Sequence, residues 1–107
     1  MSERNEKVAN RIKELAAEFL QRENNNTSLI TVTSASCSPD MKRGTIFITV
    51  LPTNKEDLAL EFAKRKRADL REYISKNMAT KVVPFIDIEI DKGERNRQKI
   101  DELLRNS

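Results

Sequence analysis

The spacing of the apolar residues changes several times along the chain between the period of a helix and the period of a strand. This pattern limits the possible folds more than any other feature of the sequence. Val8, Ile12 and Leu15 recur at intervals of four and three, which predicts an amphipathic helix over residues 3–22. The segment FIDIEID (85–91) instead alternates apolar and acidic side chains, as a strand with one buried face does. A chain with both periods folds into a mixture of helices and strands.

The remaining segments give the order of these elements. Residues 29–38 and 45–51 are rich in β-branched side chains, and the turn sequence between them predicts a hairpin. Apolar residues at helical spacing predict a tail helix over 93–107. We expect one α+β domain over residues 1–107, in the order α-β-β-α-α-β, with helices covering one face of a three-stranded sheet.

The segment between the hairpin and the last strand predicts two helices. Thr53 and Glu56 fit a capping box that would start the first of them. On one unbroken helix Lys66 would fall within the apolar stripe, where an unpaired lysine is rarely buried. We therefore expect helices over 54–64 and 68–78, with a bend beside Lys66.

Most large apolar side chains are expected in the core. Leu58 falls in the apolar stripe of the two central helices. The aromatic residues also follow apolar patterns and are assigned to the core, so the pattern predicts no base-stacking platform. They are Phe19, Phe47, Phe62, Tyr73 and Phe85.

Positive charge is concentrated in one segment. The net charge of the chain is +3, but residues 63–83 carry seven Lys and Arg against two Asp and Glu, while the blocks 1–62 and 84–107 are each at −1. A concentrated positive field favours a polyanion, and nucleic acid is the usual polyanion for a small domain. The candidate RNA-binding residues are Lys64, Arg65, Lys66, Arg67, Arg71, Lys76 and Lys81.

The sequence lacks the residues on which enzymes and metal-binding proteins usually depend. The chain has no His and a single Cys37, which removes the commonest general base and zinc ligand. Asp87, Glu89 and Asp91 line one face of a strand without converging, so we assign them to solubility and edge protection. We expect no catalytic residue, metal or cofactor. The first residues lack a signal peptide and no apolar run could span a bilayer, so we expect a cytoplasmic protein.

The sequence resembles a known family, the bacterial ribosome-binding factor A family, over nearly the whole chain. The matching stretches are Arg4, Val8 and Ile12; Val32-Thr33 and Ser38-Pro39-Asp40; Ile46-Phe47-Ile48; Leu70-Arg71; Val83-Pro84, Phe85-Ile86 and Asp91; and Ile100-Asp101-Glu102-Leu103-Leu104. The resemblance implies a type II KH-like fold. It also implies a non-enzymatic factor that binds immature small ribosomal subunits and assists late maturation of their ribosomal RNA, notably in the cold.

The chain departs from this family at one position. The family usually carries Ala-x-Gly between its two central helices, where this sequence has Lys66-Arg67-Ala68. Without this glycine, we do not expect the backbone to approach an RNA phosphate closely. We expect the closely spaced cations of this segment to bind the phosphates instead. The implied partners are the small subunit and its ribosomal RNA, bound by a monomer, with no DNA or membrane. The alternatives are a basic protein-interaction module of KH-like fold without RNA binding, and a small enzyme on a ferredoxin-like scaffold, which the missing His disfavours.

Overall fold

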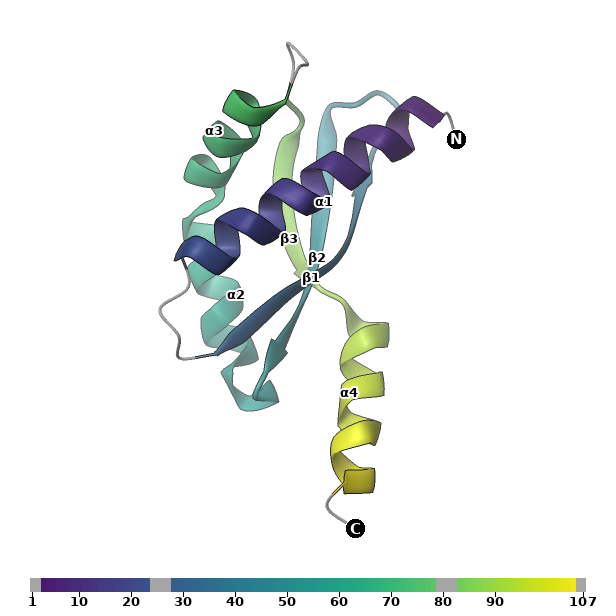
Figure 1. Cartoon of the computed structure of the whole chain (residues 1–107), viewed down its shortest axis with the longest axis vertical. Helices are drawn as coiled ribbons and strands as arrows, with labels where there is room; N and C mark the ends of the chain where they lie inside the picture. The colour runs from purple at the N-terminus through teal and green to yellow at the C-terminus, as the bar shows by residue number, and fades with distance from the viewer. Residues whose placement is uncertain (1–2, 24–27, 79–82, 106–107) are drawn as a thin grey trace.

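A computed structural model describes residues 3–23, 28–78 and 83–105 of the chain. Figure 1 shows the elements in the predicted order, with a short 3-10 turn before the central helices. They are α1 (Glu3–Glu23), β1 (Leu29–Cys37), β2 (Arg43–Leu51), η1 (Thr53–Lys55), α2 (Glu56–Arg65), α3 (Arg67–Asn77), β3 (Phe85–Ile90) and α4 (Lys92–Arg105). The predicted α+β class and element order are confirmed.

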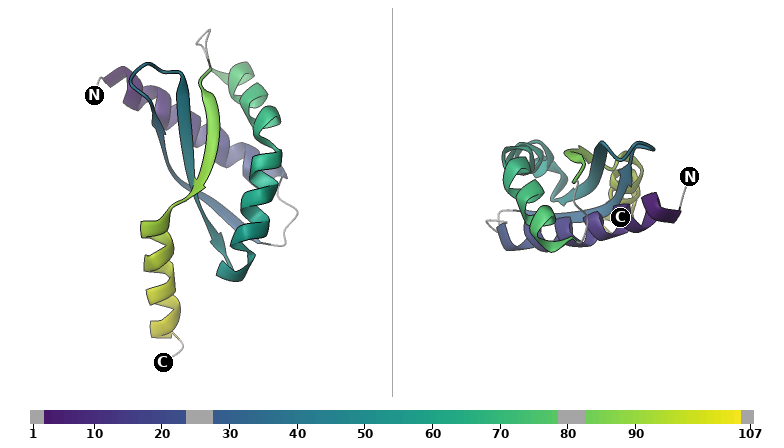
Figure 2. Two further views of the ribbon diagram at one scale, coloured as in Figure 1. Left: turned by 180° about the vertical axis from the view of Figure 1, so that it is seen from behind. Right: turned by 90° about the horizontal axis from the view of Figure 1, so that it is seen from above.

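The sheet has the strand order β1-β2-β3, so β3 is an edge strand. β1 and β2 form the predicted hairpin and pair antiparallel, with a register shift between Val32 and Ser34. β2 and β3 pair parallel, with Ile46 opposite Ile88. A parallel pair needs a long crossover, which the two central helices supply. They thereby come to lie along the β3 side of the sheet, as the view from above in Figure 2 shows.

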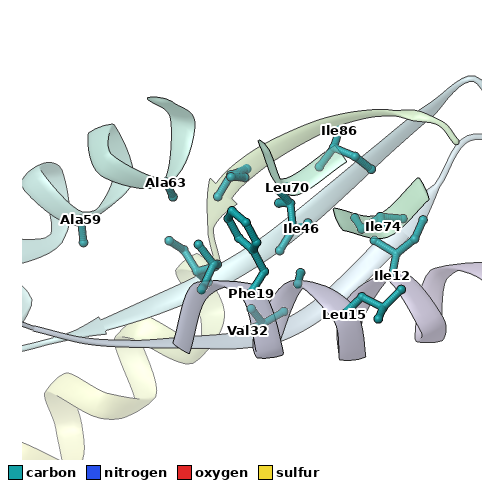
Figure 3. Packing of buried hydrophobic residues seen from close by; sticks show 14 of the residues in the cluster. Ile12, Leu15, Phe19, Val32, Ile46, Ala59, Ala63, Leu70, Ile74 and Ile86 are labelled. Atoms are coloured by element: carbon teal, nitrogen blue, oxygen red, sulfur yellow. The ribbon is translucent and has the colours of Figure 1, made fainter. Parts of the chain in front are cut away.

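The core lies between one face of the sheet and the helices α1, α2 and α3. Figure 3 shows Ile12, Leu15 and Phe19 of α1 in one apolar cluster with Ile46 of β2 and Leu70 of α3. All five side chains are at most 2% exposed. The expectation that helices cover one face of the sheet is therefore confirmed, and the apolar period of each element accounts for it.

The predicted capping box is wrong. Thr53 begins the 3-10 turn η1 and not α2, and the residue before each of these helices makes no side-chain capping bond. The carboxylate of Glu56 instead accepts a hydrogen bond from Arg95 of α4 at 3.0 Å. Thr53 and the two residues after it form the tight turn η1, so they are not available to cap α2.

Leu58 was expected in the apolar stripe, but it is 63% exposed. The buried residues of α2 are Ala59 and Ala63, which lie four apart on the helix. Leu58 precedes Ala59 by one position, about 100° around the helix, and so points away from the sheet. Small alanine side chains allow α2 to lie close against β2 and β3.

α4 extends from the end of β3 away from the other helices (Figure 1). It begins at Lys92, one residue before the predicted tail helix. The buried core contains no described residue of α4, and Ile100 and Leu103 are exposed. In the part of the chain that the structure describes, no helix has the length and apolarity needed to cross a bilayer.

Candidate nucleic-acid interface

The bend between the central helices lies at Lys66, as predicted. α2 ends at Arg65 and α3 begins at Arg67, and Lys66 between them has φ −92° and ψ 6°. Its backbone N–H donates to the carbonyls of Phe62 and Ala63 at 3.2 and 3.1 Å. Since the side chain of Lys66 is half-buried at the turn, the break keeps this lysine out of the core without a glycine or proline.

A groove of about 740 Å³ lies between this bend and the start of β3. Its helical side carries four cations, Lys64, Arg65, Arg67 and Arg71, together with Ala68, Glu72 and Ser75. Its strand side is apolar and consists of Val83, Phe85 and Ile86. The groove thus has one basic wall from residues 64–75 and one apolar wall from residues 83–86.

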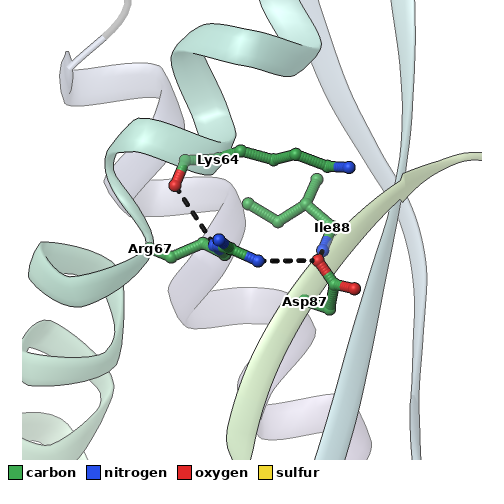
Figure 4. Close-up of polar contacts among 4 residues, drawn as sticks. All are labelled: Lys64, Arg67, Asp87 and Ile88. Atoms are coloured by element: carbon green, nitrogen blue, oxygen red, sulfur yellow. Dashed lines mark hydrogen bonds and ion pairs between the residues drawn. The ribbon is translucent and has the colours of Figure 1, made fainter.

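Arg67 reaches from α3 to Asp87 of β3, as Figure 4 shows. Its Nη1 pairs with Oδ1 of Asp87 at 3.2 Å, and its Nε donates to the carbonyl of Lys64 at 3.2 Å. The same carboxylate oxygen accepts the backbone N–H of Ile88 at 2.8 Å. Both charged side chains remain nearly half exposed, so the guanidinium of Arg67 is accessible to solvent although it is paired.

Arg71 holds the segment that leads into β3. Its Nε donates to the carbonyl of Pro84 at 3.3 Å, and its Nη2 donates to the carbonyl of Val83 at 3.0 Å. Val83 and Pro84 are buried, so these carbonyls have limited access to water. Arg71 is therefore a structural residue of the groove as well as one of its cations.

Lys64 and Arg65 are the available cations of the groove. Both side chains are exposed, and neither forms an ion pair with any residue that the structure describes. Both lie in the last turn of α2, where cations are stabilised by the helix dipole. An incoming phosphate could bind them without first breaking an internal contact.

The other predicted site residues lie elsewhere. Lys66 stands at the bend but does not line the groove. Lys76 lies farther along α3 and pairs with Glu72 at 3.0 Å. Lys81 lies outside the described residues. The structure therefore brings together four of the seven predicted cations.

Sequence reasoning missed Phe85. It was assigned to the core, but it is 59% exposed and lines the groove. Strand alternation carries the correct signal, because Phe85 shares its parity with Asp87 and Glu89 and not with the buried Ile86 and Ile88. Phe85 falls among apolar residues and is for that reason assigned to the core, but the strand period decides against its burial.

Asp87 of β3 and Asp91, which directly follows β3, have separate partners. Asp87 pairs with Arg67, whereas Asp91 accepts a hydrogen bond from Thr33 Oγ1 at 2.6 Å and one from the backbone N–H of Glu94 at 3.1 Å. These two bonds, the Thr33 bond first, lower the pKa of Asp91. In the described ranges, no three potential ligands gather in a way that could hold a metal ion.

The chain is similar to known proteins over most of its length. A family model described as "Ribosome-binding factor A" matches residues 4–104. Ribosome-binding factor A of Leifsonia xyli is 30% identical over 102 residues, which cover 92% of this chain and 72% of the relative.

Two structures from Thermus thermophilus show the same fold. The crystal structure of its ribosome-binding factor A has a TM-score of 0.75 at 17% identity and covers 82% of this chain and 96% of that one. A homology model of the same factor, fitted into a cryo-EM map of a 30S complex, has a TM-score of 0.69 at 18% identity and covers 78% and 91%.

Proposed function

Since this chain belongs to the ribosome-binding factor A family, we propose that it binds the small ribosomal subunit and its precursor and assists late maturation of the ribosomal RNA. The observation that carries this proposal is the groove with four cations on one wall. The 30S complex of the Thermus thermophilus factor supports the choice of partner. The protein acts in the cytoplasm as a monomer, without DNA or membrane, and supports maturation in the cold.

The groove is suited to phosphates. Lys64 and Arg65 form no ion pair with the described residues and so present free positive charge, whereas Arg67 and Arg71 are already fixed in place by their internal bonds. Fixed cations lose little conformational freedom when they bind an anion, which favours affinity. Binding to phosphate releases counterions from the RNA, so affinity falls steeply as salt is raised.

The mechanism is binding and release. A factor that does not react with its RNA can change the RNA only by binding one conformation more tightly than another. The cationic wall supplies affinity for either conformation, and the shape of the groove supplies the difference between them. We therefore assign the protein no catalytic step, metal or cofactor.

The test is co-sedimentation with small subunits and their precursors. The variant Lys64→Glu/Arg65→Glu removes the two available cations while leaving the structural arginines in place. We expect it to lose association at physiological salt and to keep the circular dichroism spectrum of the parent protein. The matched control is Lys7→Glu/Lys55→Glu, which changes two exposed lysines of α1 and η1 by the same total charge.

Two outcomes would contradict the proposal. If the folded Lys64→Glu/Arg65→Glu protein still travels with the subunits, the groove is not the site. If free ribosomal RNA does not compete for the parent protein, the basic segment instead docks an acidic protein surface, which is the interaction-module alternative.

A further inference from the structure

Arg67 differs from the other cations of the groove because a carboxylate of the protein already binds it. Its Nη1 lies 3.2 Å from Oδ1 of Asp87, whereas Lys64, Arg65 and Arg71 form no ion pair with any residue that the structure describes. A carboxylate and a phosphate bind a guanidinium in the same way, through oxygen atoms that accept its N–H groups. Asp87 and a phosphate therefore compete for the same side chain.

The orientation of Arg67 does not depend on Asp87 alone. A second nitrogen of the guanidinium, Nε, donates to the carbonyl of Lys64 at 3.2 Å, as Figure 4 shows. A guanidinium has five donors, so these two bonds leave others for an incoming anion. Arg67 would stay directed into this region if the charge of Asp87 were absent.

Asp87 is also held in position independently of Arg67. Its backbone lies in β3 opposite Thr45 of β2, and its Oδ1 accepts the backbone N–H of Ile88 at 2.8 Å. The side chains of Arg67 and Asp87 are 41% and 48% exposed, so a phosphate can reach the pair. An ion pair this exposed contributes little to stability. Its main consequence is for the binding of anions.

We propose that Asp87 competes with RNA phosphate for Arg67, and that this competition limits the affinity of the groove for the small subunit. An approaching phosphate either displaces the carboxylate from Arg67 or binds beside its negative charge, and both cost free energy. This inference rests on the proposed function, because it concerns the affinity of the same groove. A factor that acts by binding and release gains from the limit, since weaker binding means faster dissociation.

The test is the variant Asp87→Asn, which keeps an oxygen that can accept from Ile88 and Arg67 but removes the charge. We expect it to bind small subunits roughly three- to tenfold more tightly, as removal of one unit charge beside a bound phosphate at the protein surface predicts. Most of the gain should appear as slower dissociation. Co-sedimentation at a series of subunit concentrations measures the affinity, and dilution of the labelled complex measures the dissociation rate.

The matched control is Asp57→Asn, which makes the same chemical change on α2. Asp57 is exposed and forms no ion pair with any residue in the described ranges. It lies about 10 Å along the helix from Lys64, so salt screens most of its effect on the groove and the affinity should change less than about twofold. The control separates competition at Arg67 from the change in net charge.

A second background shows whether Asp87 acts through Arg67. In Arg67→Gln the guanidinium is gone, so the further change Asp87→Asn should raise the affinity clearly less than it does in the parent protein. The difference between the two gains measures the coupling of the two side chains. Urea denaturation confirms that each variant is folded.

Each contrary result has its own meaning. If folded Asp87→Asn binds small subunits as the parent does, or more weakly, the competition is wrong and the proposed function stands. An equal gain in the parent and in Arg67→Gln would show simple repulsion of RNA by Asp87 and would also overturn the competition. If the parent protein does not associate with small subunits at all, the proposed function fails, and this inference fails with it.

Discussion

Arginine side chains in the groove divide their donors between the protein and the solvent. Arg71 contacts two main-chain carbonyls, and Arg67 contacts one carbonyl and the carboxylate of Asp87. A planar guanidinium with five donors can do this, whereas the ammonium of Lys64 or Lys76 acts as a point charge. Residues of equal charge in one basic segment therefore have unequal roles.

Arg71→Gln should destabilise the fold as well as weaken RNA binding. It removes the bonds to Val83 and Pro84, and hydrogen bonds from charged donors contribute about 1.5–3 kcal/mol each at most, so we expect a loss of about 1–3 kcal/mol in the free energy of unfolding. The control Lys76→Gln removes an exposed pair with Glu72 and should change stability by at most about 0.5 kcal/mol. Urea denaturation followed by circular dichroism measures both. Equal effects of the two variants would contradict the structural role of Arg71.

Asp91 directly follows β3, and its carboxylate connects the end of this strand to β1 and α4. It accepts bonds from Thr33 of β1 and from the backbone of Glu94 at the start of α4. Both bonds favour the ionised form and lower its pKa below the ordinary value of 3.8. A carboxyl whose pKa is lower in the folded state stabilises the fold above its unfolded pKa, and this stability is lost as the pH falls through the folded pKa.

The variant Asp91→Asn keeps a capping side chain and removes the charge. We expect the parent protein to be more stable than this variant at pH 7, and the difference to shrink as the pH is lowered well below 3.8. Urea denaturation of both proteins at neutral and acid pH measures the difference. A difference that stays constant across this range would show that the charge of Asp91 contributes nothing.

At the scale of elements, α4 is tied to the rest of the protein mainly at its first turn. Arg95 pairs with Glu56 of α2 at 3.0 Å, and the two side chains are 27% and 15% exposed. The other carboxylate oxygen of Glu56 and Nε of Arg95 are buried and find no hydrogen-bond partner among the described residues. Such a pair gains little net stability, because desolvation offsets much of its attraction.

Removing one partner should therefore cost more than replacing both. Arg95→Met leaves the Glu56 carboxylate mostly buried without a counter-charge, and we expect a loss of about 2–3 kcal/mol in the free energy of unfolding. The double variant Glu56→Leu/Arg95→Met should be at least as stable as Arg95→Met alone. Thermal denaturation of the parent, both single variants and the double variant completes the cycle. Additive losses would show that the two side chains are not coupled.

At the scale of the whole molecule, the hydrophobic core and α4 are separate. Every buried core residue that the structure describes lies between Ala9 and Ile88, on α1, α2, α3, the three strands or the segment before β3. Folding is driven mainly by burial of this apolar surface. The molecule should thus fold without α4.

A chain that ends after Gly93 should unfold cooperatively in urea. With Glu56→Gln added, to avoid a buried unpaired charge, we expect its free energy of unfolding to lie within about 2 kcal/mol of the parent value. It should also keep the groove and associate with small subunits as the parent does. A broad, non-cooperative transition would show that α4 belongs to the cooperative core.

The sequence by itself determined the local structure. The helical and strand periods predicted each main element within a few residues, and the position of Lys66 in the apolar stripe predicted the bend between α2 and α3. The charge count also located the basic segment. These features depend on residues that are close together in the sequence. The period of the apolar side chains shows directly which of these residues share a face, so it predicts such features.

Only the tertiary structure decided how the cations of the basic segment are arranged. The parallel pairing of β3 with β2 brings Val83 and Phe85 opposite α2 and α3. As a result Arg67 and Arg71 form internal bonds to this segment, whereas Lys64 and Arg65 remain available. It also gives the groove its apolar wall. Contacts between segments far apart in the chain follow from register and packing, which the period of one segment does not specify.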